Sequence, residues 1–328
     1  MMKYVIFALV FIFPVIFIWA FFEYLPDYLP KILEGCFGVT DANAENVKMQ
    51  NFGLVGDSFG IYNALFSALA LYGVLLTLAY QSYSTKRASL IDRFYKMLDY
   101  HNAMVLELSV AKVEKPKTKD DIVIVKGRRV FVQHKIQIKY LLNAVSDINI
   151  EKELGLSVPD IADIAYAIFY YGANRSWKPN MLEYLKDYQE PEMLVDAILE
   201  KLASRKYMRY ALDRTNQNDM SVYHRNMYNA IKIINSSWLL SSAEKKDFVK
   251  ILRSQLSNAE LYVLFFNLVS RFGKKWVDND FVEKYQLIQN LPSKYCDGYD
   301  PKEYFKKIKF EGEEKALSPF REIIGMRE

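Results

Sequence analysis

The sequence predicts a mainly α-helical membrane protein, with two N-terminal transmembrane helices followed by a helical cytoplasmic domain. Three observations support this fold class. Two long uncharged, apolar stretches lie within the first 81 of the 328 residues. Basic residues flank the outer ends of the pair, whereas the segment between the stretches is acidic. Beyond residue 81, apolar residues recur mostly at intervals of three and four, the period of helices buried on one face.

The first transmembrane segment is expected at residues 1–22. No residue from 4 to 22 is charged, and a bilayer core requires about 20 apolar residues in a helix. Pro14 is tolerable there, because neighbouring helices can satisfy the backbone group that it frees. A cleavable signal peptide is the alternative. However, the residues that follow, WAFFE at 19–23, offer no small-x-small cleavage site, which favours a retained anchor.

The second transmembrane segment is expected at residues 59–81, which also carry no charge. Gly60, Ala64 and Ala68 recur every four residues and form a small-residue face that another helix can approach closely. Asn63 could hydrogen-bond across the same contact. Two interpretations stay open: this face packs on the first transmembrane helix, or it joins two copies of the chain in a homo-oligomer.

Flanking charge predicts the orientation. Lys3 precedes the first span, and four basic residues follow the second: Lys86, Arg87, Arg93 and Lys96. The positive-inside rule therefore places both termini in the cytoplasm, in a bacterium at the inner membrane, and residues 23–58 in an external loop. Two prolines and two glycines between residues 26 and 38 favour irregular structure in that loop.

The formal charge of residues 82–328 is +7, against −3 for residues 1–58. A basic domain beside a bilayer favours contact with anionic lipid over nucleic acid. The lipid bilayer is therefore the first expected partner.

Residues 82–328 are expected to form the helical cytoplasmic domain. One buried stripe predicts that the second membrane helix continues into it: Phe94, Leu98, His101, Val105 and Leu108. Residues 112–121 are a polar connector, and a short strand is expected at 122–125. A helix beginning near Gly127 has a second stripe: Phe131, His134, Ile138, Leu141 and Val145. Further helices are expected at 158–171, 191–212 and 219–235. A single helix at 244–272, opened by a capping box at Ser241–Glu244, is expected to end at Gly273.

A polar seam in this last helix is the main candidate functional cluster. The stretch from Leu261 to Val269 is apolar except for Asn267, so burial on all sides is expected. Four polar residues nevertheless follow helical spacing: Arg253, Ser257, Glu260 and Asn267. A buried charge is costly unless it is paired. The seam is therefore either an internal salt bridge that fixes helix packing or a ligand or catalytic site.

The secondary candidates are His101, Asn102, Arg128, Arg225 and Asn226. A lone histidine in an apolar stripe is more often a core residue than a catalytic one. For the polar face of Arg225, Asn229 and Lys232, simple solvated surface is the alternative to a site. Cys36 and Cys296 give no disulfide framework and no metal-ligand spacing. No P-loop, HExxH or GxSxG motif is present. The sequence therefore predicts no metal and no cofactor, and it assigns no catalytic residue.

Several short motifs follow one another along the chain: Phe94 and His101-Asn102; Gly127-Arg128 with Phe131; Tyr223, Arg225-Asn226 and Tyr228; RSQLSNAEL at 253–261; Phe265, Asn267 and Gly273; and Glu283-Lys284-Tyr285. In this order they resemble the AbiC-type family of phage abortive infection proteins. The similarity covers roughly residues 59–291. His224 departs from it by standing where an aromatic residue is expected, and residues 150–215 match nothing in the family.

The resemblance implies a bacterial protein that defends against phage. We expect a membrane-anchored abortive-infection effector whose cytoplasmic domain senses a phage protein or nucleic acid and acts at or through the membrane. One alternative is a membrane-tethered nuclease or other toxin. Arg129 and His134 fit the loose R-x4-H pattern of HEPN nucleases, although residues five apart on a helix diverge by roughly 140°. A second alternative is a non-catalytic membrane adaptor.

Overall fold

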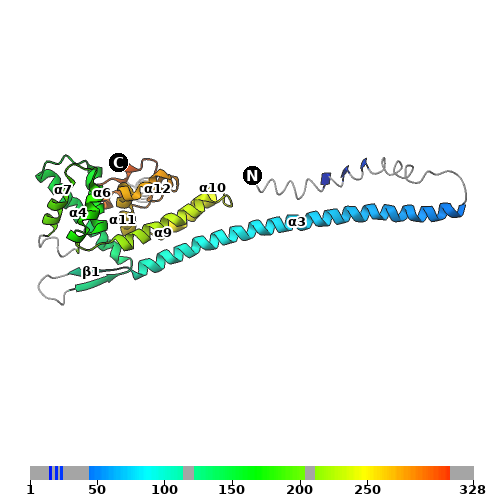
Figure 1. The fold of residues 1–328 in the computed structure, drawn as a ribbon, viewed down its shortest axis with the longest axis horizontal. Helices are drawn as coiled ribbons and strands as arrows, with labels where there is room; N and C mark the ends of the chain where they lie inside the picture. The colour runs from blue at the N-terminus through cyan, green and yellow to red at the C-terminus, as the bar shows by residue number, and fades with distance from the viewer. Residues whose placement is uncertain are drawn as a thin grey trace, which may run out of the picture. The chain divides into compact units, whose positions relative to one another are not determined.

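The computed structural model describes residues 44–113, 122–203 and 211–310, with short helical pieces at 15–16, 19–20 and 23–24. The chain divides into two compact units, residues 1–88 and 89–328. It is mainly helical, as predicted (Figure 1). The predicted first transmembrane segment lies almost entirely outside the described residues, so the expectation of two spans stays a prediction.

Helix α3 (Ala44–Glu107) contains the predicted second transmembrane segment. Within the described part of the chain it is the one helix long and apolar enough to cross a membrane. Five large apolar side chains of its apolar stretch are more than half exposed: Phe66, Leu71, Val74, Leu75 and Leu78. Residues 44–58, which were expected to belong to an irregular loop, are helical. That expectation rested on the two prolines and two glycines between residues 26 and 38, which all precede residue 44. Residues 44–58 contain no proline.

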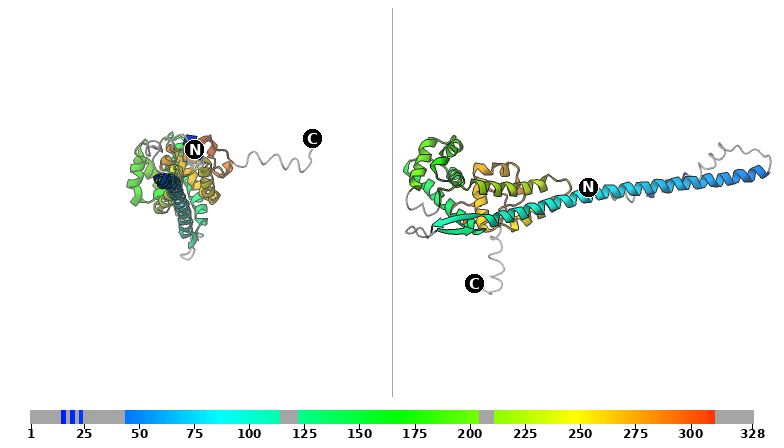
Figure 2. Two further views of the ribbon diagram at one scale, coloured as in Figure 1. Left: turned by 90° about the vertical axis from the view of Figure 1, so that its right-hand side faces the viewer. Right: turned by 60° about the horizontal axis from the view of Figure 1, so that its bottom comes forward.

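In the second unit, the C-terminal part of α3 buries the predicted stripe. Phe94, Leu98, His101, Val105 and Leu108 are all at most 4% exposed. Helices α9 (Gln217–Ser236) and α10 (Ser242–Ser254) run alongside this part of α3 (Figures 1 and 2). Asn226 Nδ2 donates to Met97 O at 3.0 Å. The rings of Phe94 and Phe248 meet edge to face with their centroids 5.2 Å apart. The helix leaving the apolar stretch is thus part of the domain core.

A β-hairpin follows α3. The predicted strand is confirmed as β2 (Ile122–Lys126), which pairs antiparallel with β1 (Ser109–Val113). Part of β1 was expected to belong to the polar connector. Gly127 has φ +64°, a left-handed conformation that glycine adopts without steric cost, and it turns the chain into α4 (Arg129–Glu151). Arg128 lies in this turn, directly before the helix.

The centre of the second unit is formed by α4, α5 (Val158–Tyr171) and α11 (Asn258–Val269). The second predicted stripe, on α4, is buried throughout. Nine consecutive residues of α5 and ten of α11 are buried, because both helices are covered on all sides. Helices α6 (Lys178–Leu185) and α7 (Pro191–Leu202) pack at the outer side of α4 and α5. Turn η2 (Arg175–Trp177) leads into α6.

Two predicted helix boundaries are wrong. The helix expected at 191–212 ends at Leu202, and residues 211–214 form a turn in which Ala211 has φ +52°. The single helix expected at 244–272 is two helices, α10 and α11, separated at residues 255–257. Ser257 is extended, with ψ 162°, and caps α11 through its side chain. The backbone therefore changes direction where a continuous helix was expected.

Short elements complete the unit after α11: η3 (Arg271–Gly273), α12 (Lys274–Asp278), α13 (Phe281–Lys284), η4 (Ser293–Tyr295) and α14 (Pro301–Tyr304). Gly273 permits the tight reversal after α11. A Cβ atom at this position would lie 2.3 Å from the carbonyl oxygen of Asn267. Any larger residue would push the C-terminal elements away from α11.

Candidate functional site

Glu260 is a fully buried carboxylate in the first turn of α11. Its Oε2 accepts hydrogen bonds from the backbone N of Ser257 at 2.8 Å and from Ser257 Oγ at 2.6 Å. Its Oε1 accepts from Tyr223 Oη at 3.4 Å. The N-terminal dipole of α11 also favours negative charge at this position. The chain contains two further capping boxes, at Ser157–Asp160 and Ser241–Glu244, but their side-chain bonds are exposed.

A chain of polar contacts leads from Glu260 towards the surface. Arg128 Nη1 lies 3.9 Å from Glu260 Oε2, and Arg128 Nη2 donates to Asn102 Oδ1 at 3.3 Å. Asn102 Nδ2 in turn donates to Gln255 Oε1 at 3.0 Å. The side chain of Arg128 is 45% exposed, whereas that of Glu260 is 0% exposed. We call this set the Glu260 cluster: Asn102, Arg128, Tyr223, Gln255, Ser257 and Glu260.

His101 packs against this cluster. Its ring centroid lies 4.7 Å from that of Tyr223, and its side chain is 3% exposed. Neither ring nitrogen of His101 has a hydrogen-bond partner among the described residues. Burial, followed by the charge of Glu260, raises the pKa of Tyr223 well above its usual value. The phenol therefore stays protonated and donates a hydrogen bond to Glu260. The unpartnered imidazole carries a free-energy cost that another arrangement of this region could relieve.

A second buried polar group lies two turns farther along α11, where it meets α5 and α9. Tyr166 Oη, on α5, accepts from Asn267 Nδ2 at 3.1 Å and lies 3.1 Å from His224 Nε2. With the Asn267 amide donating to the hydroxyl oxygen, His224 Nε2 is the neighbouring group that can accept the hydroxyl's own proton, and in that tautomer the ring proton is on Nδ1. Burial lowers the pKa of His224 to about 3, which keeps the ring neutral. His224 Nδ1 and Asn267 Oδ1 have no partner among the described residues.

The predicted polar seam does not form one row. Ser257 and Glu260 meet in the capping box, and Asn267 belongs to the Tyr166 group. Arg253, at the end of α10, donates from Nη1 to Gln286 O at 2.7 Å. The ion-pair partner that the structure gives Glu260 is Arg128. The interpretation of an internal salt bridge within one helix is therefore replaced by a contact with the β2–α4 turn.

The secondary candidates separate in the same way. His101, Asn102 and Arg128 gather around Glu260, as described above. Asn226, on α9, donates a hydrogen bond to the backbone of α3. Arg225 is exposed. Sequence reasoning missed the roles of Tyr223 and Gln255. The available signal was the Ser-x-x-Glu spacing of Ser257 and Glu260, which repeats that of Ser241 and Glu244 and predicts a helix start.

The Arg129–His134 pattern receives no support as a catalytic pair. Arg129 is exposed, whereas His134 is 1% exposed. The His134 ring meets those of Phe131 and Phe169 at centroid distances of 5.8 and 5.1 Å. Its Nδ1 lies 3.0 Å from Gln137 Oε1, and burial lowers its pKa to about 4. His134 is therefore a neutral core residue.

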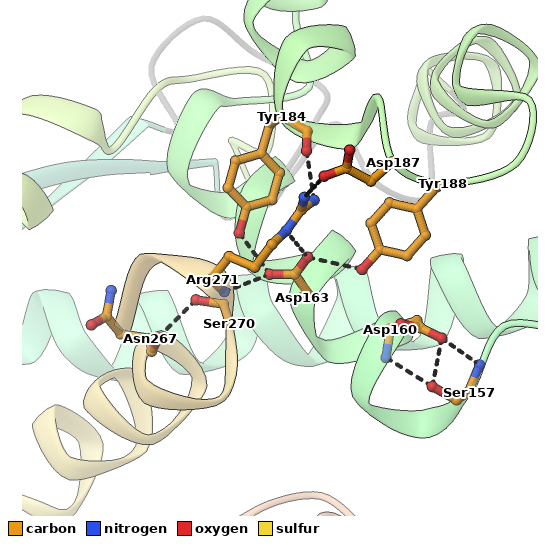
Figure 3. A network of polar contacts seen from close by, with 9 residues as sticks. All are labelled: Ser157, Asp160, Asp163, Tyr184, Asp187, Tyr188, Asn267, Ser270 and Arg271. Atoms are coloured by element: carbon orange, nitrogen blue, oxygen red, sulfur yellow. Dashed lines mark hydrogen bonds and ion pairs between the residues drawn. The ribbon is translucent and has the colours of Figure 1, made fainter. Parts of the chain in front are cut away.

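A third polar network is centred on Asp163 of α5 (Figure 3). Its carboxylate accepts from Tyr184 Oη at 2.6 Å, from Tyr188 Oη at 2.9 Å, and from the backbone N and Nε of Arg271 at 2.8 and 3.0 Å. The Arg271 guanidinium lies 4.2 Å from the centre of the Tyr184 ring and also pairs with Asp187 at 3.0 Å. Both carboxylate oxygens of Asp163 have donors, which is the arrangement of a structural clamp between α5, α6 and η3.

The Glu260 cluster joins five parts of the second unit: the end of α3, the β2–α4 turn, α9, the α10–α11 connection and the start of α11. The Glu260 side chain is 0% exposed. A substrate would therefore reach the carboxylate only after rearrangement. A charged junction of several elements, with the unpartnered His101 ring packed against it, is suited to switching between two arrangements.

Comparison with known proteins finds a match to one family model within this region. Residues 215–295 match the family model described as putative phage abortive infection protein, putAbiC. No curated protein and no solved structure shows a significant match to the chain. The family match confirms the AbiC-type resemblance and supports a role in phage defence. The matched segment begins just before α9 and ends at η4, so it contains Tyr223, Ser257, Glu260 and Asn267.

Proposed function

We propose that this protein is a membrane-anchored effector of antiphage defence, in which the helical domain senses infection and acts at or through the bacterial inner membrane. The family match of residues 215–295 supports the defence role. The length, composition and exposed apolar side chains of α3 support anchoring. The proposal includes a first span at residues 1–22, cytoplasmic termini and association of copies through the face of Gly60, Ala64 and Ala68.

The observation that carries the proposal is the continuity of α3. The apolar stretch and Asn102 belong to one helix, Ala44–Glu107. The Asn102 side chain bonds to Arg128 and Gln255 of the Glu260 cluster. An infection signal that rearranges the cluster would therefore act directly on the helix that continues into the apolar stretch. The molecule that carries the signal must bind the rearranged cluster more tightly than the arrangement described here, since only differential binding shifts an equilibrium.

The test records membrane potential and RNA integrity together in phage-challenged bacteria expressing the chain. Glu260→Gln retains an acceptor oxygen and the capping-box geometry, since glutamine also serves in capping boxes. It removes the buried charge beside Arg128 and Tyr223. The matched control is Glu244→Gln, the same change in an exposed capping box. We expect wild type and Glu244→Gln to depolarise the membrane on infection, and Glu260→Gln to accumulate normally but neither depolarise it nor protect the culture.

Other outcomes have distinct meanings. RNA decay without depolarisation would replace the proposal with a tethered nuclease. Protection with neither effect would favour a non-catalytic adaptor. Full protection by Glu260→Gln would reduce the cluster to a structural feature, in which Glu260 only caps α11.

A further inference from the structure

A cavity of ≈ 740 Å³ lies against α9, the C-terminal part of α11 and α12. Three cationic residues line it: Arg225 and Lys232, two turns apart on α9, and Lys275 on α12. No carboxylate is among its lining residues, and these three cations make no ion pair within the described part of the chain. The cavity is therefore a region of uncompensated positive charge, which favours an anionic ligand.

Aromatic rings form much of the remaining wall. Tyr228 and Trp276 meet edge to face with centroids 5.3 Å apart, and Tyr170 and Phe272 pack at 4.4 Å. Trp276 is 3% exposed, so its ring is fixed in the fold. Rings beside cations are the combination that binds a planar base next to a phosphate, because bases stack on aromatic side chains while basic groups neutralise the phosphate.

Two buried polar residues complete the wall, and each has an unpartnered atom. His224 and Asn267 are 7% and 4% exposed and both line the cavity. The Tyr166 hydroxyl contacts His224 Nε2 and Asn267 Nδ2, as described above. The other polar atom of each side chain, the donor His224 Nδ1 and the acceptor Asn267 Oδ1, has no partner among the described residues. The edge of a nucleobase offers a matching acceptor and donor. Both atoms are buried in this arrangement, so a ligand would reach them after a small movement of the wall and would relieve the cost of leaving them unpaired.

We propose that this cavity binds a nucleotide, with its phosphates at Arg225, Lys232 and Lys275, its base among the aromatic rings, and a polar edge of the base directed towards His224 and Asn267. The volume lies within the range of about 300–1,000 Å³ typical of small-molecule sites. A nucleotide bound here would be the signal that the proposed sensor detects, so its biological role rests on the proposed function. Binding itself can be tested without any assay of phage defence.

Binding can be measured on the full-length protein in detergent by calorimetry and thermal shift. The probes are the ribonucleoside triphosphates and monophosphates of all four bases, with adenosine, tripolyphosphate and a short single-stranded RNA as comparison ligands. Arg225→Gln and Lys275→Gln change exposed side chains, so the fold should be retained. The control is Lys274→Gln, since Lys274 adjoins Lys275 but does not line the cavity.

We expect at least one nucleotide to bind, the double variant Arg225→Gln/Lys275→Gln to weaken binding at least tenfold, and Lys274→Gln to bind as the wild type does. Three results would overturn the assignment: no nucleotide binds, tripolyphosphate binds as tightly as any nucleotide, or Lys274→Gln weakens binding as much as Lys275→Gln. Binding of the RNA alone would replace the free nucleotide with a nucleic-acid strand. Nucleotide binding by a protein that fails to protect cells would refute the proposed function and leave the site intact.

Discussion

Replacing Asp163 with asparagine is expected to destabilise the helical domain severely, because this carboxylate is 5% exposed and accepts four hydrogen bonds. Asparagine is nearly the same size, but it exchanges one acceptor oxygen for an NH₂ group. That group would face a donor, either a tyrosine hydroxyl or the Arg271 side chain. The negative charge that pairs with the guanidinium of Arg271, whose side chain is 37% exposed, is lost as well. Breaking a buried pair by removing one partner costs about 3–5 kcal/mol.

Asp187→Asn is the matched control, because the two carboxylates share Arg271. Asp187 also lies 3.0 Å from the guanidinium, but its side chain is 72% exposed. An exposed ion pair contributes only about 0–1 kcal/mol. The two variants therefore make the same chemical change to partners of one arginine and differ chiefly in burial.

Thermal unfolding of the full-length protein in detergent measures the difference. For a domain of this size, 1 kcal/mol corresponds to roughly 2–4 °C in Tm, so Asp163→Asn should lower Tm by about 6–20 °C and Asp187→Asn by no more than about 4 °C. Equal, small shifts would refute the reasoning, since they would mean that the Asp163 network is not the clamp that its geometry implies.

Three further predictions concern pH, helix packing and topology. Burial holds His134 and His224 neutral in the folded protein, with pKa values of about 4 and about 3. The unfolded chain binds their protons first, so stability should fall as the pH drops below about 6.5, by about 1.4 kcal/mol per pH unit for each histidine. Urea unfolding at pH 7 and 5 measures this, and an equal slope in His134→Leu would contradict it. Ala68→Leu should weaken phage protection at normal abundance, because it blocks close helix approach; unchanged protection would show that the face is not needed. A reporter fused after Glu328 should read as cytoplasmic and one inserted at Thr40 as external, and an external C-terminus would refute the proposed topology.

Periodicity predicted those parts of the fold that depend on one buried face. The stripes on α3 and α4 are buried, and the expected bounds of the helix at 158–171 agree with α5. These succeeded because the spacing of apolar residues within a helix is a local property of the chain. The hairpin was half predicted: the run at 122–125 is dense in β-branched residues, whereas Ser109–Val113 alternates weakly and continues from a long helix.

The candidate site was predicted in its members and not in its arrangement. Glu260 stood out as a charged residue in an apolar helix, Asn102 was selected for its place beside the stripe of His101, and Arg128 for its place in a motif of the family resemblance. Their grouping was hidden, because residues 102, 128 and 260 meet only through the tertiary fold. The single-helix interpretation failed at Ser257, where the helical spacing of the seam obscured a capping signal that stops one helix and begins another. Asp163 was overlooked because one carboxylate within the apolar run of α5 gives no pattern.

The two polar groups on α9 and α11 lie close enough to be coupled. Tyr223 and His224 are consecutive on α9 and therefore point about 100° apart; one bonds Glu260 and the other meets Tyr166. On α11, Glu260 and Asn267 are two turns apart and belong to the same two groups. A ligand that drew His224 and Asn267 towards the cavity would rotate or shift α9 against α11. The 3.4 Å hydrogen bond from Tyr223 to Glu260 is the longest in the cluster and the first that such a shift would break; its loss would leave the carboxylate with Ser257 and Arg128 as partners. Arg128 also donates a hydrogen bond to Asn102 on α3. A movement of Arg128 would therefore be transmitted from Glu260 to α3 through the side chains of Arg128 and Asn102.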